Sequence, residues 1–361
     1  MASPLFSPID LRSMHLENRI VVSPLAQFMA EGNGNATDWH LMHLGNLALS
    51  GASLLIAEAT AVEQRGANTH NYLGLWSDAN EQALKRVVDF CRTLSPIKLG
   101  IQLHHAGRKG SVVKPWEGMT QIDIADGGWP LISASSLPYE ARKNPVEAPN
   151  EQGLARIKSL FVESARRSAR IGFDVIELHY GHGYLMHSFM SPLSNLRQDR
   201  YGGDLEGRMR FPLEVFQAVR RIWPEERPIG VRISATDWTE GGWDIADSIE
   251  FSRALKELGC DYVALSSGGL SPEQKITAGP AYQVPFSEHV RRETGITTLA
   301  VGLLHDPKLA ESVLIEGKAD LVAIGRGMMA DPRWPWRAAK ALGEKMRYPL
   351  PYDRCQPALV T

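Results

Sequence analysis

Short apolar segments recur along the chain, and longer amphipathic segments separate them. Eight of the short segments are apolar at nearly every position and do not alternate with polar residues. Continuous apolar runs of this length are typical of parallel strands that are covered on both faces of the sheet. The eight predicted strands are Arg19–Ala26, Leu54–Ala61, Leu99–His105, Val175–Gly181, Ile229–Ala235, Tyr262–Gly268, Thr298–Leu303 and Leu321–Gly325.

The segments between these strands carry helix patterns, with apolar residues at i, i+3 and i+4. The clearest predicted helices are Leu154–Arg170, Phe211–Trp223, Ala246–Leu258 and Pro307–Glu316. Glycines that suit a left-handed C-terminal cap precede several of the next strands, at Gly172, Gly259, Gly295 and Gly317. Eight alternations of strand and helix favour a closed (β/α)₈ TIM barrel of the α/β class. An open doubly wound sheet fits the sequence less well, because no G-x-G-x-x-G motif follows the first strand.

Two segments depart from the plain barrel repeat. Residues 108–150 are rich in Pro, Gly and Trp and are too long for an ordinary connection. We therefore expect an excursion after the third strand that caps the barrel mouth. Residues 344–361 form a C-terminal tail. Barrels of this kind run long as single domains, so the prediction is one domain over residues 1–361.

Composition narrows the classes of function. The chain is 43% hydrophobic and 22% charged, with a net charge of −2, so no basic face indicates nucleic acid or membrane as a partner. The three cysteines, Cys91, Cys260 and Cys355, are too scattered for a disulfide framework or a zinc site. No apolar run of about 18 residues and no signal-peptide pattern occur. We therefore expect a reduced, cytoplasmic protein that acts on small molecules.

In a barrel of this kind the chemistry lies at the carboxyl ends of the strands. Two adjacent strands end in glycine, at Gly302 and Gly325, where backbone N–H groups can approach an anion. Arg326 adds a charged donor beside them. The combination indicates a phosphate site, and the alternative is that the two glycines only turn the chain.

Two further polar residues lie on strands. Gln102, on the third strand, offers a donor and an acceptor to the edge of a planar heterocycle. Arg232, inside the fifth strand, is costly to bury unless it is paired. It can stabilise negative charge on a ligand ring, or it can form an ion pair with Glu177 or Asp237.

The fourth strand ends in the most informative stretch, which contains His179, His182 and Tyr184. Both histidines can project into the mouth and donate to one substrate oxygen, and the tyrosine can give a proton to a carbon centre. A structural histidine pair is the alternative. A metal site that also uses His104 and His105 is disfavoured, because the first strand brings no ligand and a neighbouring arginine opposes a divalent cation.

These residues lie in motifs that resemble the Old Yellow Enzyme family over nearly the whole chain. The fourth-strand motif H-x-x-(H/N)-G-Y-L is followed by the family signature, which reads SPLSNLRQDRYGGDLEGRMRF over residues 191–211. The histidine pair, the run QLHHAGRK over residues 102–109 and the short C-terminus are similar to the bacterial thermophilic-like branch, which includes xenobiotic reductases. The resemblance implies an FMN-dependent ene-reductase with ping-pong kinetics. NADPH or NADH reduces the flavin, which passes a hydride to the β-carbon of an enone, maleimide or nitroalkene.

The resemblance also implies which residues hold the flavin. The residues that line the isoalloxazine would be Ser23, Pro24, Leu25, Ala26 and Ala59. Gln102 would lie on its pyrimidine edge, and Arg232 would face N1 and O2 and stabilise the anionic reduced flavin. The phosphate would be held by Gly302, Gly325 and Arg326.

Substrate contacts are implied in the same way. His179 and His182 would bind the carbonyl or nitro oxygen, and Tyr184 would supply the proton for the α-carbon. Arg354 resembles a tail arginine that this branch inserts into a neighbouring subunit's site, which implies a homodimer or homotetramer.

The chain departs from the branch at two positions beside the flavin. Ala26 stands where a cysteine is usual, so the thiol that tunes the flavin redox potential is missing. Phe28, a candidate substrate contact, stands where a tyrosine is usual and lacks the hydroxyl that would bond the substrate oxygen. One neutral hydrogen bond contributes roughly 0.5–1.5 kcal/mol, or about tenfold in affinity at most. We therefore expect Ala26 and Phe28 to alter substrate preference and rate without removing hydride transfer.

Two other functions are compatible with a flavin barrel. One is an enzyme with another substrate; dienoyl-CoA reductases and amine dehydrogenases carry extra domains and a cysteine-bound iron–sulfur cluster, which are not seen here. Dihydrouridine synthases act on RNA and would be expected to have a basic surface. The other is a flavin-binding protein that has lost catalysis, which the intact set of His179, His182 and Tyr184 disfavours.

Overall fold

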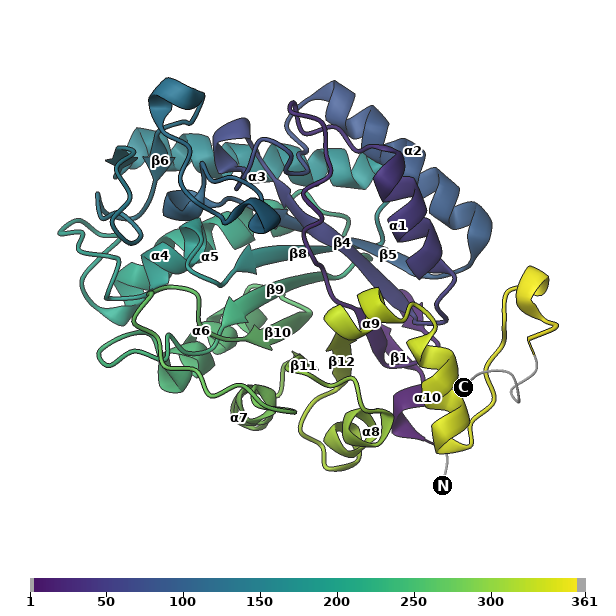
Figure 1. Ribbon diagram of the computed structural model, residues 1–361. Coiled ribbons are helices and arrows are strands. Elements are labelled where there is room, and N and C mark those ends of the chain that lie inside the picture. Colours follow the sequence, from purple (N-terminus) through teal and green to yellow (C-terminus); the bar gives the residue numbers. More distant parts are fainter. Residues whose placement is uncertain (1–2, 356–361) are drawn as a thin grey trace.

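Eight parallel strands close into a barrel in the computed structural model, which describes residues 3–355. The strands follow one another around the barrel in chain order, and Figure 1 shows them at the centre of the molecule. They are β3 (Ile20–Val22), β4 (Leu54–Ala61), β5 (Lys98–His104), β8 (Val175–Tyr180), β9 (Ile229–Ser234), β10 (Tyr262–Ser266), β11 (Thr297–Ala300) and β12 (Leu321–Ile324). Each predicted strand is present, most with shorter ends, so the predicted (β/α)₈ barrel is confirmed.

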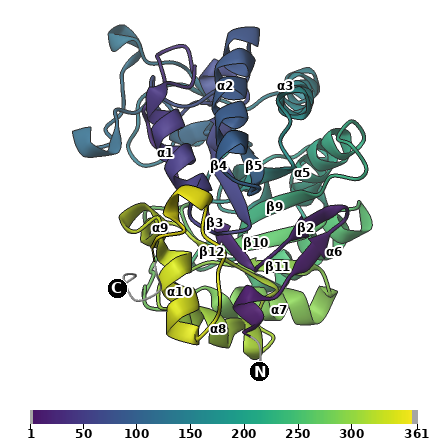
Figure 2. The same ribbon diagram turned by 90° about the vertical axis from the view of Figure 1, so that its right-hand side faces the viewer.

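Helices surround the barrel, as Figure 2 shows from a second direction. The longer ones are α1 (Asp38–Ala48), α2 (Asp78–Leu94), α3 (Glu151–Ile171), α5 (Leu205–Arg220), α6 (Ile245–Glu257), α7 (Val284–Thr294), α8 (Pro307–Ile315) and α10 (Trp334–Leu342). Two short helices, α4 (Leu185–Met190) and α9 (Arg326–Ala330), follow strands at the mouth. The four helices predicted above correspond to α3, α5, α6 and α8, and the four predicted cap glycines all have positive φ.

The barrel interior is apolar at one end. A short antiparallel hairpin of β1 (Ile9–Leu11) and β2 (Met14–Leu16) precedes the first barrel strand. Its side chains pack in one buried cluster with inward residues of the barrel strands, including Val21, Ile56 and Val175. The sequence patterns did not predict this hairpin. Because it closes the amino-terminal end of the barrel, the opposite end remains for chemistry.

Alternation along the strands makes the interior polar toward the mouth. Residues two apart on a strand share a face, so Val175 in the apolar cluster is followed on the same face of β8 by Glu177 and then His179. The parallel register sets Gln102 beside Glu177, and His179 beside Arg232. Neighbouring strands therefore place predicted site residues in one region.

The segment after β5 crosses the mouth, as expected for residues 108–150. It contains the 3₁₀ turns η3 (Gly107–Lys109), η4 (Pro115–Glu117) and η5 (Ile124–Asp126), and a parallel pair of β6 (Leu131–Ile132) with β7 (Val146–Glu147). Arg108 donates to the carbonyl of Leu270 at 2.9 Å, which ties this excursion to the loop after β10. In Figure 1 the excursion stands beyond the ends of the strands, around β6.

Three other short turns complete the described chain: η1 (Pro4–Phe6), η2 (Gln64–Gly66) and η6 (Leu350–Tyr352). The tail after α10 runs outward from the body in Figure 1. Residues 1–2 and 356–361 of the predicted domain and tail lie outside the described residues. Within residues 3–355, no helix combines the length and the apolar character that a bilayer crossing requires.

Candidate active site

A charged layer lies inside the barrel just below the mouth. Glu177 on β8 is buried and accepts hydrogen bonds from Gln102 Nε2 at 2.7 Å and from the Tyr262 hydroxyl at 3.2 Å. Burial raises the pKa of Glu177, and the charge of Arg232 opposes this effect. Because the Gln102 amide nitrogen donates to Glu177, its carbonyl oxygen is the atom suited to accept from a ligand N–H.

Arg232 has one side-chain partner and one unsatisfied atom. Its Nη1 donates to Ser23 Oγ at 3.0 Å, whereas its buried Nε has no hydrogen-bond partner among residues 3–355. The alternative of an ion pair is not observed within 4 Å in the described residues: Asp237 instead lies 2.9 Å from His187. Burial lowers the pKa of Arg232 and the charge of Glu177 raises it. An unpaired buried donor of this kind is typical of a site that receives a ligand acceptor.

The two histidines predicted at the end of β8 lie together. His182 Nδ1 is 3.1 Å from His179 Nε2, and their rings meet edge to face at 4.9 Å. The backbone N–H of Gly181 donates to His179 Nδ1 at 3.2 Å, so the proton of a neutral His179 resides on Nε2. Burial lowers the pKa of both imidazoles well below the usual range, with nearby histidines and Arg232 adding to the effect. Both rings are therefore neutral at pH 7.

Backbone packing sets the position of His182. Its φ is +57°, and the adjacent Gly183 has a φ of +75°. A Cβ on Gly183 would lie 2.2 Å from the carbonyl oxygen of Gly269, so only glycine permits this contact between the loops after β8 and β10. Lys109 Nζ, from the excursion, donates to the carbonyls of His182 at 3.0 Å and Gly269 at 2.7 Å. These contacts hold the histidine loop in place.

Tyr184 lies beside the histidine pair and is partly exposed. Its ring is 5.1 Å from His179 and 4.3 Å from His104. Burial raises the pKa of the Tyr184 hydroxyl, and a side-chain hydrogen bond from Asn68 opposes this. The structure thus brings His179, His182 and Tyr184 together, as predicted, and adds Asn68 and Ser266 to their surroundings. The sequence patterns did not indicate these two additional residues.

The predicted phosphate residues lie at the ends of β11 and β12. Gly302 has a φ of +123°, which side chains rarely permit, and Gly325 directly precedes α9 with Arg326 exposed beside it. A Cβ on Gly325 would lie 3.2 Å from the Leu25 side chain. The backbone N–H of Ser23 donates to the carbonyl of Ile324 at 3.1 Å, so the loop after β3 runs beside this end of β12.

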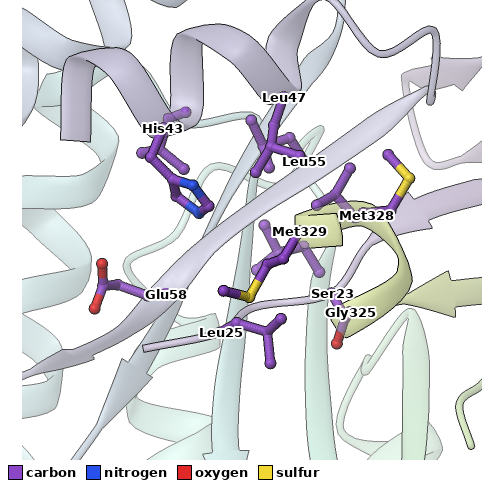
Figure 3. Close-up of a pocket in the computed structure, with 12 residues that line it drawn as sticks. Ser23, Leu25, His43, Leu47, Leu55, Glu58, Gly325, Met328 and Met329 are labelled. Atoms are coloured by element: carbon purple, nitrogen blue, oxygen red, sulfur yellow. The ribbon is translucent and has the colours of Figure 1, made fainter. Parts of the chain in front are cut away.

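A small cavity lies behind these residues, between α1, β4 and α9. Figure 3 shows Ser23, Leu25 and Gly325 at one side of it and His43 and Glu58 at the other. Its volume is about 10 Å³, which is room for roughly one water molecule. This cavity is therefore too small to be the ligand site, which we assign to the mouth.

An apolar rim borders the mouth on the β3 and β4 side. Ala26 and Phe28 pack against a buried cluster that includes Ala59 and Tyr72. The Phe28 ring is 5.7 Å from the Tyr72 ring and 6.2 Å from the ring of Trp116 in the excursion. Pro24, also predicted to line the flavin, is buried beside them in the chain.

The remaining predicted residue lies elsewhere. Arg354 is exposed, in the tail that leaves the body after α10, and no described contact joins it to the mouth of its own chain. Within residues 3–355, no three His, Cys, Asp or Glu side chains are grouped so that they could hold a metal ion. His104, His179 and His182 instead lie beside Asn68, Tyr184 and Ser266.

Comparisons with known proteins agree with this geometry. A model described as the NADH:flavin oxidoreductase / NADH oxidase family matches residues 4–345. An NADPH dehydrogenase of Geobacillus thermodenitrificans is 41% identical over 98% of this chain and 99% of its own length. An NADH:flavin oxidoreductase of Gibberella zeae is 40% identical over 96% of this chain and 87% of its own. The solved structure of morphinone reductase superposes with a TM-score of 0.79 at 27% identity, over 96% of this chain and 91% of that one.

The barrel, its polar mouth and these similarities define an NAD(P)H-dependent flavin oxidoreductase that uses FMN. The chain belongs to the NADH:flavin oxidoreductase / NADH oxidase family, which is the Old Yellow Enzyme family. Membership over nearly the full chain confirms the predicted family, the enzyme class and the cofactor.

Proposed function

We propose that this enzyme is an ene-reductase for α,β-unsaturated carbonyl and nitro compounds. NAD(P)H provides the hydride that reaches the β-carbon, and the α-carbon receives a proton. The observation that carries the proposal is the convergence of His179, His182 and Tyr184 beside the charged layer of the barrel. Two hydrogen-bond donors for an oxygen and one acid for a carbon are the groups that this reaction needs.

The residues of the mouth fit FMN. The unpartnered Arg232 Nε can donate to an oxygen or nitrogen of the ring, and the Gln102 carbonyl oxygen can accept from a ring N–H. Gly302, Gly325 and Arg326 would hold the phosphate, because the two glycines have no side chain to keep an anion from the backbone and Arg326 supplies a positive charge. When bound, FMN accepts the hydride from NAD(P)H and delivers it to the alkene.

The histidine pair has a proton arrangement that a substrate oxygen can use. His179 Nε2–H points at His182 Nδ1, so a carbonyl or nitro oxygen can replace His182 as the acceptor. His182 can donate to the same oxygen only if its proton moves to Nδ1. Ser266 permits this, because its hydroxyl lies 2.8 Å from His182 Nε2 and can either accept from it or donate to it. The two donated bonds polarise the alkene toward attack at the β-carbon.

Ala26 and Phe28 shape the rest of the substrate site. Both belong to the apolar rim that includes Ala59 and Tyr72, so this side of the mouth offers contact area in place of hydrogen bonds. We therefore propose that orientation of the substrate oxygen depends on the histidines alone. Apolar enones are the substrates that this rim favours.

We propose further that the enzyme is a cytoplasmic homodimer or homotetramer in which Arg354 reaches a neighbouring active site. The tail is anchored near α10, where Trp336 packs against Tyr348 at 4.5 Å and Tyr352 at 5.7 Å. Beyond this anchor Arg354 is exposed. A charged residue presented away from its own barrel is suited to contact another subunit.

Anaerobic titration of the holoenzyme with NADPH, followed by addition of 2-cyclohexenone, tests the proposed reaction. We expect the visible flavin band to bleach and then to recover when the enone is added. Bleaching without recovery would retain the flavin oxidoreductase and reject enones as the oxidant. Flavin that NADPH and NADH both fail to reduce would reject the ene-reductase and favour a flavin-binding protein without this catalysis.

A further inference from the structure

Asn68 lies next to the proposed proton donor but belongs to no strand or helix. It follows the turn η2 after β4, and it is 3% exposed. Its backbone carbonyl accepts from Val112 N–H at 2.9 Å, which attaches this segment to the excursion over the mouth. Its side chain lies beside both His104 and Tyr184, whose rings meet edge to face at 4.3 Å. Asn68 Oδ1 is 2.9 Å from His104 Nε2, and a side-chain hydrogen bond joins Asn68 to Tyr184.

His104 fixes the orientation of the Asn68 amide. His104 is fully buried at the end of β5, and burial lowers its pKa well below the usual range, so it is neutral with one ring proton. An amide oxygen can only accept, so that proton lies on Nε2 and is donated to Asn68 Oδ1. His104 Nδ1 has no partner among residues 3–355, which agrees with this tautomer. The Asn68 –NH₂ group is therefore turned away from His104 and remains available to Tyr184.

We propose that Asn68, oriented by His104, is a positioning residue that holds the Tyr184 hydroxyl and stabilises the phenolate left after proton transfer. This inference rests on the proposed function, in which Tyr184 is the proton donor. In that step the O–H bond of Tyr184 breaks and a C–H bond forms at the α-carbon. The electron pair remains on the phenolate oxygen, which accepts the Asn68 N–H, and water later restores the proton.

If Asn68 positions Tyr184, loss of its amide should affect flavin reduction, enone reduction and nitroalkene reduction to different extents. Reduction of the flavin by NADPH needs no proton from Tyr184, so loss of the Asn68 amide leaves this step unchanged. Reduction of an enone needs that proton. A nitroalkene that accepts hydride forms a nitronate, which is a stable anion and can leave before it is protonated. Enone reduction should therefore slow while nitroalkene reduction does not.

Asn68→Asp is the most direct test, because aspartate keeps the shape and the acceptor for His104 but has no N–H for Tyr184. One neutral hydrogen bond corresponds to roughly a three- to tenfold change in rate. We expect enone reoxidation of the reduced holoenzyme to slow by about that factor or more, with NADPH reduction and 1-nitrocyclohexene turnover within about twofold of the parent. Asn68→Leu removes the amide without adding charge, and it is the second test variant if the aspartate variant does not fold. Asn71→Asp is the matched control, because Asn71 in the same segment donates to the Ala30 carbonyl at 2.9 Å.

A second readout is independent of turnover. In protein labelled with [ζ-¹³C]tyrosine, the Tyr184 resonance is the one missing from Tyr184→Phe, and its pH titration gives the pKa. We expect this pKa to rise in Asn68→Asp and Asn68→Leu and not in Asn71→Asp. An unchanged Tyr184 pKa, or equal slowing of enone and nitroalkene, would overturn the role of Asn68. Undiminished enone reduction by Tyr184→Phe would instead reject Tyr184 as the proton donor, which is a failure of the proposed function.

Discussion

Glu63 provides a stability prediction with a defined pH window. It follows β4 and accepts hydrogen bonds from His105 Nε2 at 3.0 Å and from Arg156 Nη1 at 2.7 Å. Burial alone would raise its pKa, but these two partners outweigh burial and lower the pKa from 4.5 to about 2. A carboxyl with a lowered pKa stabilises the folded state fully above pH 4.5, and this contribution is lost as pH falls toward 2. The difference amounts to about 3 kcal/mol, of which about 2 kcal/mol disappears between pH 5 and pH 3.

Glu63→Gln removes the titrating group and keeps most of its shape. Urea unfolding of the flavin-free protein, followed by far-UV circular dichroism at several pH values, gives the free energy of unfolding of each form. We expect the parent to lose about 2 kcal/mol more than the variant between pH 5 and pH 3. Glu147→Gln is the control, because Glu147 pairs with Arg65 at 2.9 Å while its side chain is 57% exposed. A constant difference between parent and Glu63→Gln across this range would refute the reasoning.

Three other outcomes are expected at the mouth and tail. Arg232→Met should lower the two-electron reduction potential of bound flavin, because the anionic reduced flavin loses a neighbouring positive charge. Equilibration with reference dyes measures this potential, and an unchanged value would contradict the placement of Arg232 beside the flavin. His179→Ala and His182→Ala should each raise the KM for 2-cyclohexenone, up to about tenfold, and leave FMN bound. Colourless protein from either variant would indicate a structural role. Arg354→Ala should raise the KM for the enone without affecting flavin reduction by NADPH, and sedimentation shows whether the oligomer persists; an unaltered KM would reject the shared site.

The barrel could be predicted from the sequence because its strands are covered on both faces. A run such as Leu54–Ala61 is buried at every position, so it is apolar at nearly every position and easily recognised. The hairpin of β1 and β2 could not be predicted in this way. Each of its strands has only three residues, and Asp10 and His15 interrupt the apolar positions. Its role in closing the barrel depends on contacts with strands that lie far away in the sequence.

In the candidate site, too, some residues could be predicted from the sequence and others could not. Residues at strand ends, such as His179 and Gly325, could be assigned to the mouth because the carboxyl ends of all eight parallel strands lie at the same end of the barrel. Asn68 lies in an irregular segment, and its approach to Tyr184 depends on the packing of three loops. The tautomers of the histidine pair depend on the backbone N–H of Gly181 and on Ser266 from another strand. No local pattern carries such information.

The charged layer links stability to the cofactor. The buried Nε of Arg232 finds no hydrogen-bond acceptor among the protein groups of residues 3–355. A buried donor that lacks an acceptor costs about 1–3 kcal/mol, so this position favours a ligand that supplies one. An apolar residue in place of Arg232 would need no acceptor, yet Glu177 would then lie buried without its positive neighbour. Bound FMN should therefore stabilise the fold by more than the packing of its ring alone, because its ring offers an acceptor to this donor.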